Sequence, residues 1–129
     1  EDRIVLVSPK ILKKATHGFV SSESINVLGY FFPPDYIEYW HDQWLTEIYT
    51  AVGRIASSKH FQINHNSYRN DKSLLDDVYL RCNILDKNGK TLIKLMKEFY
   101  HSDGQIQARL NTIQKLEQYI KLQKETRKL

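Results

Sequence analysis

The N-terminal part of the chain combines a short apolar run with a segment of mixed polarity. The run Arg3–Val7 is rich in β-branched residues, and Ser8 and Pro9 close it, which predicts a buried strand. Residues 10–29 are mixed in polarity and are interrupted by glycines. We expect a loop there, with a short strand or a helical turn at Ser24–Leu28.

The middle of the chain has the spacing of an amphipathic helix. Pro33 and Pro34 precede it, and proline costs little in a first turn because its missing N–H would be unpaired there anyway. Apolar side chains then recur three and four residues apart, at Ile37, Trp40, Trp44, Leu45, Ile48, Tyr49 and Val52. Such a stripe packs against a core, so we expect a helix over Asp35–Val52 that Gly53 terminates.

Further patterns indicate one more strand and three more helices. His60–His65 alternates apolar and polar residues, as a half-buried strand does. Leu74–Leu85 and Thr91–Tyr100 have the apolar spacing of short helices. The segment from Ser102 to Gly104 should break the second of these. Gln105–Arg127 predicts a long amphipathic helix that ends the chain.

This last helix has an apolar side and a charged side. Its apolar side consists of Ile106, Leu110, Ile113, Leu116, Ile120 and Leu122. Its charged residues, which we expect to face solvent, are Arg109, Lys115, Glu117, Lys121, Lys124 and Arg127. The expected fold class is therefore α+β, helix-rich with a few short strands, over residues 1–129 as a single domain or fragment.

Composition narrows the choice of partners. The chain has 129 residues, 41% of them hydrophobic, which suits one domain with a packed core. The net charge is +4, and the basic residues gather only near the end, so nucleic acid is not expected as the main partner. The single cysteine, Cys82, excludes an internal disulfide and a cysteine-based zinc site.

Hydropathy bears on location. No apolar run reaches the roughly 20 residues that span a bilayer, and no signal-peptide pattern is found, so we expect no membrane span. An intracellular, cytoplasmic or viral location is favoured. The sequence begins abruptly with a strand pattern, which suggests a piece of a longer protein.

Candidate chemistry centres on FFPPDYIEYWHDQWLTEIYTAVGR, residues 31–54. Trp40 and Trp44 share a helix face, and the simplest interpretation is that both are core while His41 and Asp42 are solvated. The alternative is that the rigid aromatic segment around Phe32 forms the edge of a binding pocket, because aromatic rings bury much area and stack on flat or sugar-like faces.

Two other segments carry weaker signals. His65 lies at the end of a predicted strand, where its imidazole could bind a divalent ion or a phosphate, or hydrogen-bond a carbonyl. Asp76 and Asp77 would either cap a helix or serve in acid–base or metal chemistry. Phosphate loops, dinucleotide fingerprints, paired-cysteine motifs and nucleophile elbows are missing from the sequence.

The order of these pieces points to a family. A His-x-Phe loop at His17 precedes a Gly-aromatic-Phe-Pro segment, and the motif Trp-x-Asp-x-Trp-Leu-x-x-x-Tyr follows at residues 40–49. A strand ending in His65, a loop with Tyr68 and the step Lys72–Tyr79 complete the series. This series resembles the C-terminal, acceptor-side half of GT-A type nucleotide-sugar glycosyltransferases, in the divergent branch seen in large viruses, algae and bacteria.

The resemblance implies a GT-A like α/β fold over residues 1–80, with 81–129 as a helical C-terminal extension. It implies that Asp42 is the catalytic base and that His65 binds a divalent cation, Mn²⁺ or Mg²⁺. The substrate-binding residues it implies are Phe32, Trp40, His41, Trp44 and Tyr68. The partners it implies are a nucleotide sugar and a hydroxyl acceptor on a carbohydrate or a protein.

This sequence departs from the family in two ways. The Asp-x-Asp motif of the nucleotide-binding half, which should precede Arg3, is not in this sequence. Ser21, Ser22 and Glu23 replace a basic residue that is often found before the Gly-Phe-Pro loop.

A non-catalytic alternative remains open. The apolar residues of 105–127 recur at a spacing that can pack against a helix of another chain. The chain would then be a helical protein-interaction or scaffold domain, or a homodimer. The simpler role of this helix is to pack on its own domain.

Overall fold

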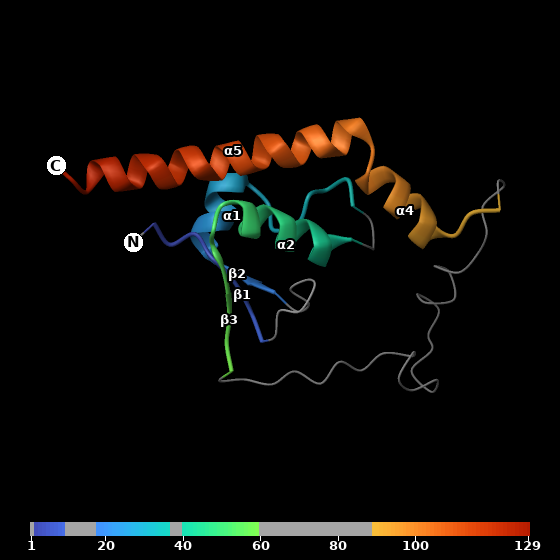
Figure 1. The fold of residues 1–129 in the computed structure, drawn as a ribbon, viewed down its shortest axis with the longest axis horizontal. Coiled ribbons are helices and arrows are strands. Elements are labelled where there is room, and N and C mark those ends of the chain that lie inside the picture. Colours follow the sequence, from blue (N-terminus) through green and yellow to red (C-terminus); the bar gives the residue numbers. More distant parts are fainter. Residues whose placement is uncertain (1, 10–17, 37–39, 60–88) are drawn as a thin grey trace.

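The computed structural model describes residues 2–9, 18–36, 40–59 and 89–129. These residues form a helix-rich α+β arrangement with one small sheet (Figure 1). The strands are β1 (Leu6–Ser8), β2 (Phe19–Val20) and β3 (Ile55–Ser57). The helices are α1 (Ser22–Leu28), α2 (His41–Ala51), α4 (Leu92–Tyr100) and α5 (Asp103–Thr126). The expected helix-rich α+β class with a few short strands is confirmed, and so is the long helix at the end.

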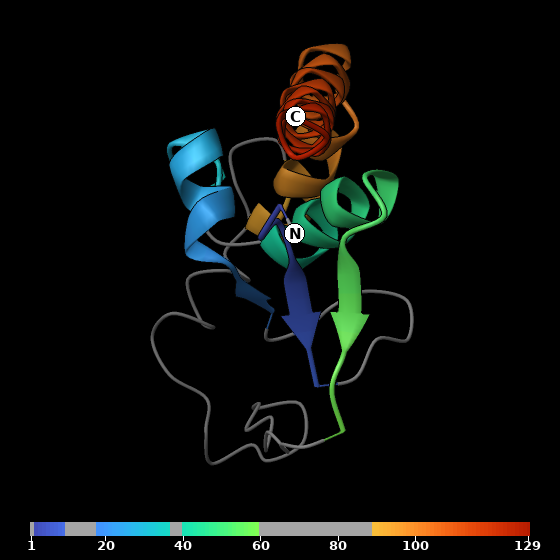
Figure 2. The ribbon, with the colours of Figure 1, turned by 90° about the vertical axis from the view of Figure 1, so that its left-hand side faces the viewer.

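The sheet is mixed, with β1 in the centre. β1 pairs antiparallel with β2, where Leu6 faces Val20, and parallel with β3, where Leu6 faces Ile55. Helix α5 lies across α1 and α2, which separate it from the sheet (Figures 1 and 2). The order from one side to the other is therefore α5, then α1 and α2, then the sheet.

One hydrophobic core joins these layers. Its buried members are Ile4, Leu6, Leu28, Tyr36, Trp44, Leu45, Ile48, Tyr49, Tyr100, Leu116 and Ile120. Helix α2 contributes the largest share, and its apolar residues recur three and four apart as expected. Helix α5 contributes Leu116 and Ile120, which are 0% and 7% exposed.

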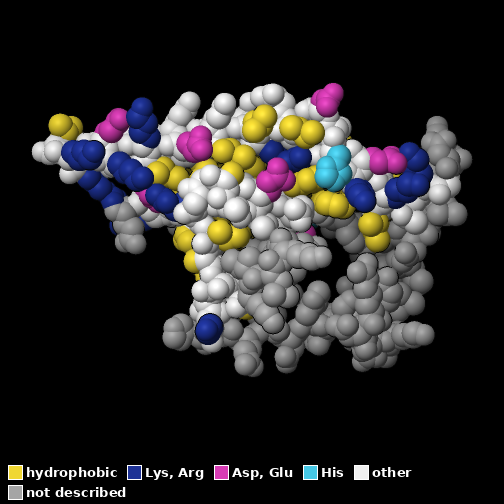
Figure 3. Space-filling view, viewed as in Figure 1, with side chains coloured by type: hydrophobic (Ala, Val, Ile, Leu, Met, Phe, Trp, Pro, Cys, Tyr) yellow, Lys and Arg dark blue, Asp and Glu magenta, His cyan; other side chains and the backbone are white. Residues whose placement is uncertain are grey.

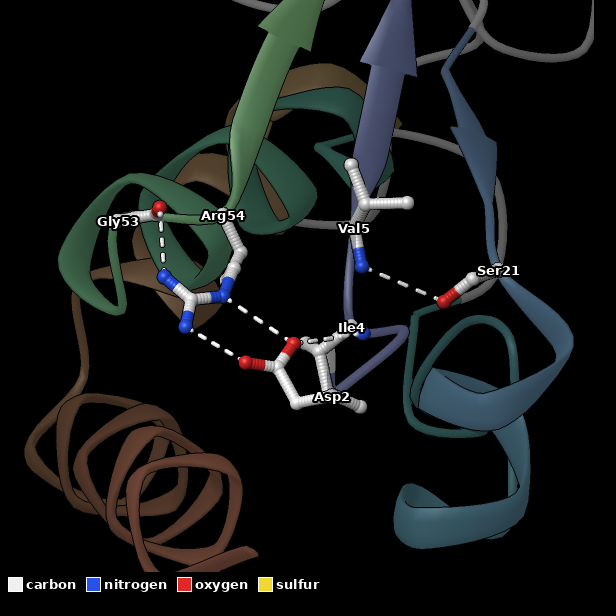
Figure 4. Close-up of polar contacts among 6 residues, drawn as sticks. All are labelled: Asp2, Ile4, Val5, Ser21, Gly53 and Arg54. Atoms are coloured by element: carbon white, nitrogen blue, oxygen red, sulfur yellow. Dashed lines mark hydrogen bonds and ion pairs between the residues drawn. The ribbon is translucent and has the colours of Figure 1, made fainter. Parts of the chain in front are cut away.

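Polar contacts hold the start of β1 against its neighbours (Figure 4). The guanidinium of Arg54 donates to both carboxylate oxygens of Asp2, at 2.7 and 3.3 Å. The hydroxyl of Ser21 accepts from the backbone N–H of Val5 at 3.3 Å. The same hydroxyl accepts from the N–H of Ser24 at 3.3 Å, and so caps α1. These contacts fix the entry of β1 between α1 and β3.

The predicted start of the central helix is wrong. We expected the helix to begin at Asp35, but α2 begins at His41. The N–H of Tyr36 donates to the carbonyl of Pro33 at 3.2 Å, so the prolines start a turn instead. Trp40 has a φ of 74°, which is left-handed backbone that an α-helix cannot contain. The predicted stop is confirmed, since Gly53 has a φ of 65°.

The strand predictions need three corrections. Strand β2 (Phe19–Val20) lies in a segment that was expected to be a loop. β1 covers Leu6–Ser8 rather than Arg3–Val7, and Arg3 has a φ of 61°, which is not extended backbone. Strand β3 was not predicted, because its three residues are too few to show a period and depend on pairing with β1. The helical turn near Ser24 is confirmed as α1. The expected elements His60–His65 and Leu74–Leu85 lie outside the described residues.

The observed bounds of α4 and α5 lie within two residues of the expected ones, but one residue of α5 faces the other way. The hydroxyl of Thr91 accepts from the N–H of Lys94 at 3.3 Å and starts α4. The expected break is confirmed only at Ser102, because α5 begins at Asp103 and includes Gly104, two residues before the expected start at Gln105. The solvent-facing assignment of Arg109 is wrong, because its side chain lies on the buried side of α5 and Arg109 is only 4% exposed. Across the described residues, no helix is long and apolar enough to cross a membrane.

Candidate functional site

The turn before α2 presents aromatic side chains at the surface. Phe31 and Phe32 are 36% and 37% exposed, and their ring centroids lie 4.2 Å apart. The ring of Phe32 lies 4.5 Å from the half-buried ring of His41, the first residue of α2. Phe31, Phe32, Trp40 and His41 are called here the α2 aromatic cluster.

A backbone contact fixes the ring of His41. Its Nε2 lies 3.0 Å from the carbonyl oxygen of Tyr36. A carbonyl oxygen only accepts, so Nε2 carries the hydrogen, and Nδ1 is the acceptor of the neutral ring. This hydrogen bond to Tyr36 orients the imidazole, whose ring lies beside that of Phe32.

Trp40 is held by α4. Its ring lies 5.1 Å from the ring of Tyr100, tilted by 33°, and 5.8 Å from the ring of His101. Tyr100 is buried, whereas Trp40 is half-buried and His101 is exposed. The residue that precedes α2 and the end of α4 therefore meet through these rings.

Asp42 lies in the first turn of α2, directly after His41. Its side-chain Oδ1 lies 2.9 Å from the backbone N–H of Gln43, and the residue is half-buried. The N-terminal turn of a helix favours a negative charge because the backbone N–H groups point outward there. A carboxylate is therefore well accommodated at this position.

Two motif residues that share the helix with Asp42 face inward. Trp44 is 2% exposed and packs 6.0 Å from the ring of Tyr30, so it supports the site from the core rather than lining a surface. Tyr49 is fully buried, and burial raises its pKa. The remaining expected residues, His65 and Tyr68, lie outside the described part of the chain.

A charged network of the buried Arg109 and the partly exposed Glu47 lies around Tyr100, the residue that Trp40 contacts. The guanidinium of Arg109 lies over the ring of Tyr100 at 3.8 Å, and its Nη1 donates to the Tyr100 carbonyl at 2.8 Å. Its Nε is 3.3 Å from a carboxylate oxygen of Glu47, which also accepts from the Tyr100 hydroxyl. Burial, followed by this bond to Glu47, raises the pKa of Tyr100 well above its ordinary value.

Sequence reasoning missed this network and His101. Arg109 does share the three- and four-residue spacing of Thr112, Leu116 and Ile120, which all lie on the buried side of α5. That spacing could have placed Arg109 on the buried side of α5. Its charge led instead to its assignment to the solvent-facing side. His101 follows the last residue of α4 and belongs to no pattern.

The expected cation has no site among the residues described. No group of three or more His, Cys, Asp or Glu side chains lies close enough there to hold a metal ion. His65 and its surroundings fall outside that part, so the metal site stays a prediction.

No family model, curated protein or solved structure matches this chain.

Proposed function

We propose that this chain forms the acceptor side of a GT-A type glycosyltransferase, which transfers a sugar from a nucleoside diphosphate sugar to a hydroxyl group. The observation that carries the proposal is the position of Asp42 in the helical turn that begins with Trp40 and His41. Phe32, which the motif pattern also assigns to the site, contacts His41 at 4.5 Å.

The α2 aromatic cluster suits a sugar ring. Carbohydrates present faces of C–H groups that pack on aromatic rings, and they present hydroxyl groups at their edges. Phe31 and Phe32 supply partly exposed ring faces. With its hydrogen on Nε2, the neutral ring of His41 offers Nδ1 as an acceptor for a hydroxyl group.

In the proposed reaction Asp42 acts as the general base. Its carboxylate takes the proton of the acceptor hydroxyl while that oxygen forms a bond to the anomeric carbon of the donor sugar. The bond between that carbon and the diphosphate oxygen breaks, and the electron pair leaves with the diphosphate. Asp42 is the one residue of this chain that takes part in this step. The step does not depend on the predicted Mn²⁺ or Mg²⁺ ion at His65.

The test is sugar transfer by the natural protein and by its Asp42→Asn variant. Release of nucleoside diphosphate is followed with UDP-, GDP- and dTDP-sugars in the presence of Mn²⁺, with and without a carbohydrate acceptor. We expect Asp42→Asn to lower turnover by at least about 100-fold, the size of a general-base contribution. Asp103→Asn, an exposed acid in the first turn of α5, is the matched control and should keep its turnover. Equal turnover in Asp42→Asn, or no transfer with any donor, contradicts the proposal.

A second candidate is a protein-interaction domain. Ile106, Leu110 and Leu122 of α5 are 42%, 48% and 57% exposed. Hydrophobic side chains accordingly reach the surface between charged ones along α5 (Figure 3). If this face binds a second copy, sedimentation should show a dimer that Leu110→Ser dissociates. A monomer at all concentrations that also transfers sugar favours the transferase.

A further inference from the structure

The α4–α5 segment meets the proposed acceptor site at one place. Trp40, which immediately precedes α2, contacts the rings of Tyr100 and His101 at the end of α4. These two residues belong to segment 81–129, to which the family resemblance assigns no role. We propose that Trp40 and His101 form a sugar-binding subsite, so that the acceptor is a carbohydrate and the end of α4 helps to select it. This inference rests on the proposed function.

The backbone of Trp40 is the first argument. Its φ of 74° is uncommon for a residue with a large side chain, and it costs on the order of 1 kcal/mol. The ring is nevertheless only half-buried, so burial of the indole alone does not account for this conformation. Backbone strain of this kind concentrates where a side chain must be presented in one orientation.

The rigidity of the support is the second argument. The ring of Trp40 lies against Tyr100, whose position is fixed by Arg109 and Glu47. Arg109 and Tyr100 are 4% and 2% exposed, so both groups lie within the packed interior. A binding surface that does not rearrange loses less entropy when a ligand binds.

The chemistry of the two surface rings is the third argument. The rings of Trp40 and His101 lie at 75° to one another, so they offer an apolar face and a polar edge in different directions. An imidazole can donate to one hydroxyl group and accept from another. A sugar presents both kinds of surface at once, which suits this corner better than a purely apolar or purely ionic ligand.

The charges near this corner do not point to a charged ligand. The carboxylate of Glu47 bonds the hydroxyl of Tyr100, and its side chain is 43% exposed. The positive partner in this network, Arg109, is buried and already engaged by Glu47 and by the Tyr100 carbonyl. The exposed Lys97 lies one turn before His101, so the exposed charges near this corner are of both signs and do not select a charged ligand. A neutral glycan is therefore the expected ligand.

The chain provides its own control for a binding experiment. It contains two tryptophans, and Trp44 is 2% exposed. The two indole N–H groups give separate signals in a ¹H–¹⁵N spectrum of the natural protein. Neutral methyl glycosides and disaccharides of glucose, galactose and mannose serve as probes. We expect at least one of them to shift the signals of Trp40 and His101 and to leave the Trp44 signal in place.

Variants of His101 separate binding from folding. His101→Ala removes an exposed side chain, so the melting temperature should hold, while affinity for the glycan should fall about 3- to 10-fold through the loss of one hydrogen bond. His101→Gln keeps a donor and an acceptor and should recover part of the affinity. Lys124→Ala, an exposed change near the C-terminal end of α5, should bind as the natural protein does.

The outcomes distinguish this subsite from the proposed reaction. If no probe shifts Trp40 or His101, or if His101→Ala binds normally, the subsite is wrong even where Asp42-dependent transfer is found. If the glycan shifts both residues and His101→Ala weakens it, the subsite stands even where Asp42→Asn keeps full turnover. The second result would describe a carbohydrate-binding protein without the proposed chemistry.

Discussion

The guanidinium carbon of Arg109 lies 3.8 Å above the ring centroid of Tyr100. Arg109 belongs to α5 and Tyr100 to α4, and Glu47 of α2 contacts both. A cation over an aromatic face gains most where water is excluded, and Arg109 is 4% exposed. The contact therefore joins α4 to α5, and Glu47 links both to the helix that carries the proposed base.

Replacing Arg109 should destabilise the protein strongly. Arg109→Ala removes the cation–π contact, the bond to the Tyr100 carbonyl and the ion pair with Glu47. We expect the free energy of unfolding to fall by about 2–3 kcal/mol, less than for a fully buried pair because the Glu47 side chain is 43% exposed. Urea unfolding measures the change, with the exposed Lys115→Ala in the same helix as the control. Equal stability of the two variants contradicts the role given to Arg109.

Alkaline conditions should destabilise the fold through Tyr100. Burial, followed by the bond to Glu47, raises the pKa of Tyr100 above its ordinary value of 10.0, so the folded protein holds this proton more tightly than the unfolded chain does. The stability that Tyr100 contributes is therefore fully present below about pH 10 and is lost as the pH rises above it. Urea unfolding between pH 8 and 11 should show a shallower decline for Tyr100→Phe. A parallel decline in both proteins would remove Tyr100 from the explanation.

Acidic conditions should destabilise the fold through Asp2. The hydrogen bond from Arg54 holds the pKa of Asp2 below its ordinary value of 3.8, so the stability it provides is present above about pH 4 and is lost as the pH falls further. Asp2→Asn should therefore be less stable than the natural protein at pH 7 and should approach it near pH 2. A stability difference that does not change with pH would show that the ion pair is not responsible.

Two glycine substitutions should have opposite effects. A Cβ on Gly18 would lie 2.6 Å from a methyl carbon of the fully buried Leu6, so Gly18→Ala should cost about 1–3 kcal/mol by overpacking. A Cβ on Gly104 in α5 meets nothing within 4 Å, so Gly104→Ala should gain about 0.4–1 kcal/mol by restricting the unfolded chain. Thermal unfolding of the two variants tests both signs together.

The helices were predictable where the local sequence determines them. α4 and α5 have regular apolar spacing, so the expected bounds of both helices were close to the observed ones. The start of α2 was misplaced because proline suits the first turn of a helix and of a β-turn equally well. The left-handed backbone of Trp40 has no signal in the local sequence, and the ring that Trp40 contacts, Tyr100, lies far along the sequence.

The site was predictable only in part for the same reason. The motif brings together Trp40, His41 and Asp42, and local turn geometry adds Phe32. The inward direction of Trp44 follows from its position in the apolar stripe, which favoured the core interpretation that was left open. The contribution of His101 could not be read from its neighbours, because it arises only when α4 packs against α2.

The burial of Leu116 and Ile120 has a consequence for synthesis on the ribosome. Both side chains come from α5, yet they fill the space between α1 and α2, which are translated long before them. Until α5 emerges, the apolar surface that Leu116 and Ile120 cover lacks these side chains. The nascent chain should therefore engage chaperones at this stage, and release of a product cut short before α5 should lead to aggregation rather than to a smaller folded domain.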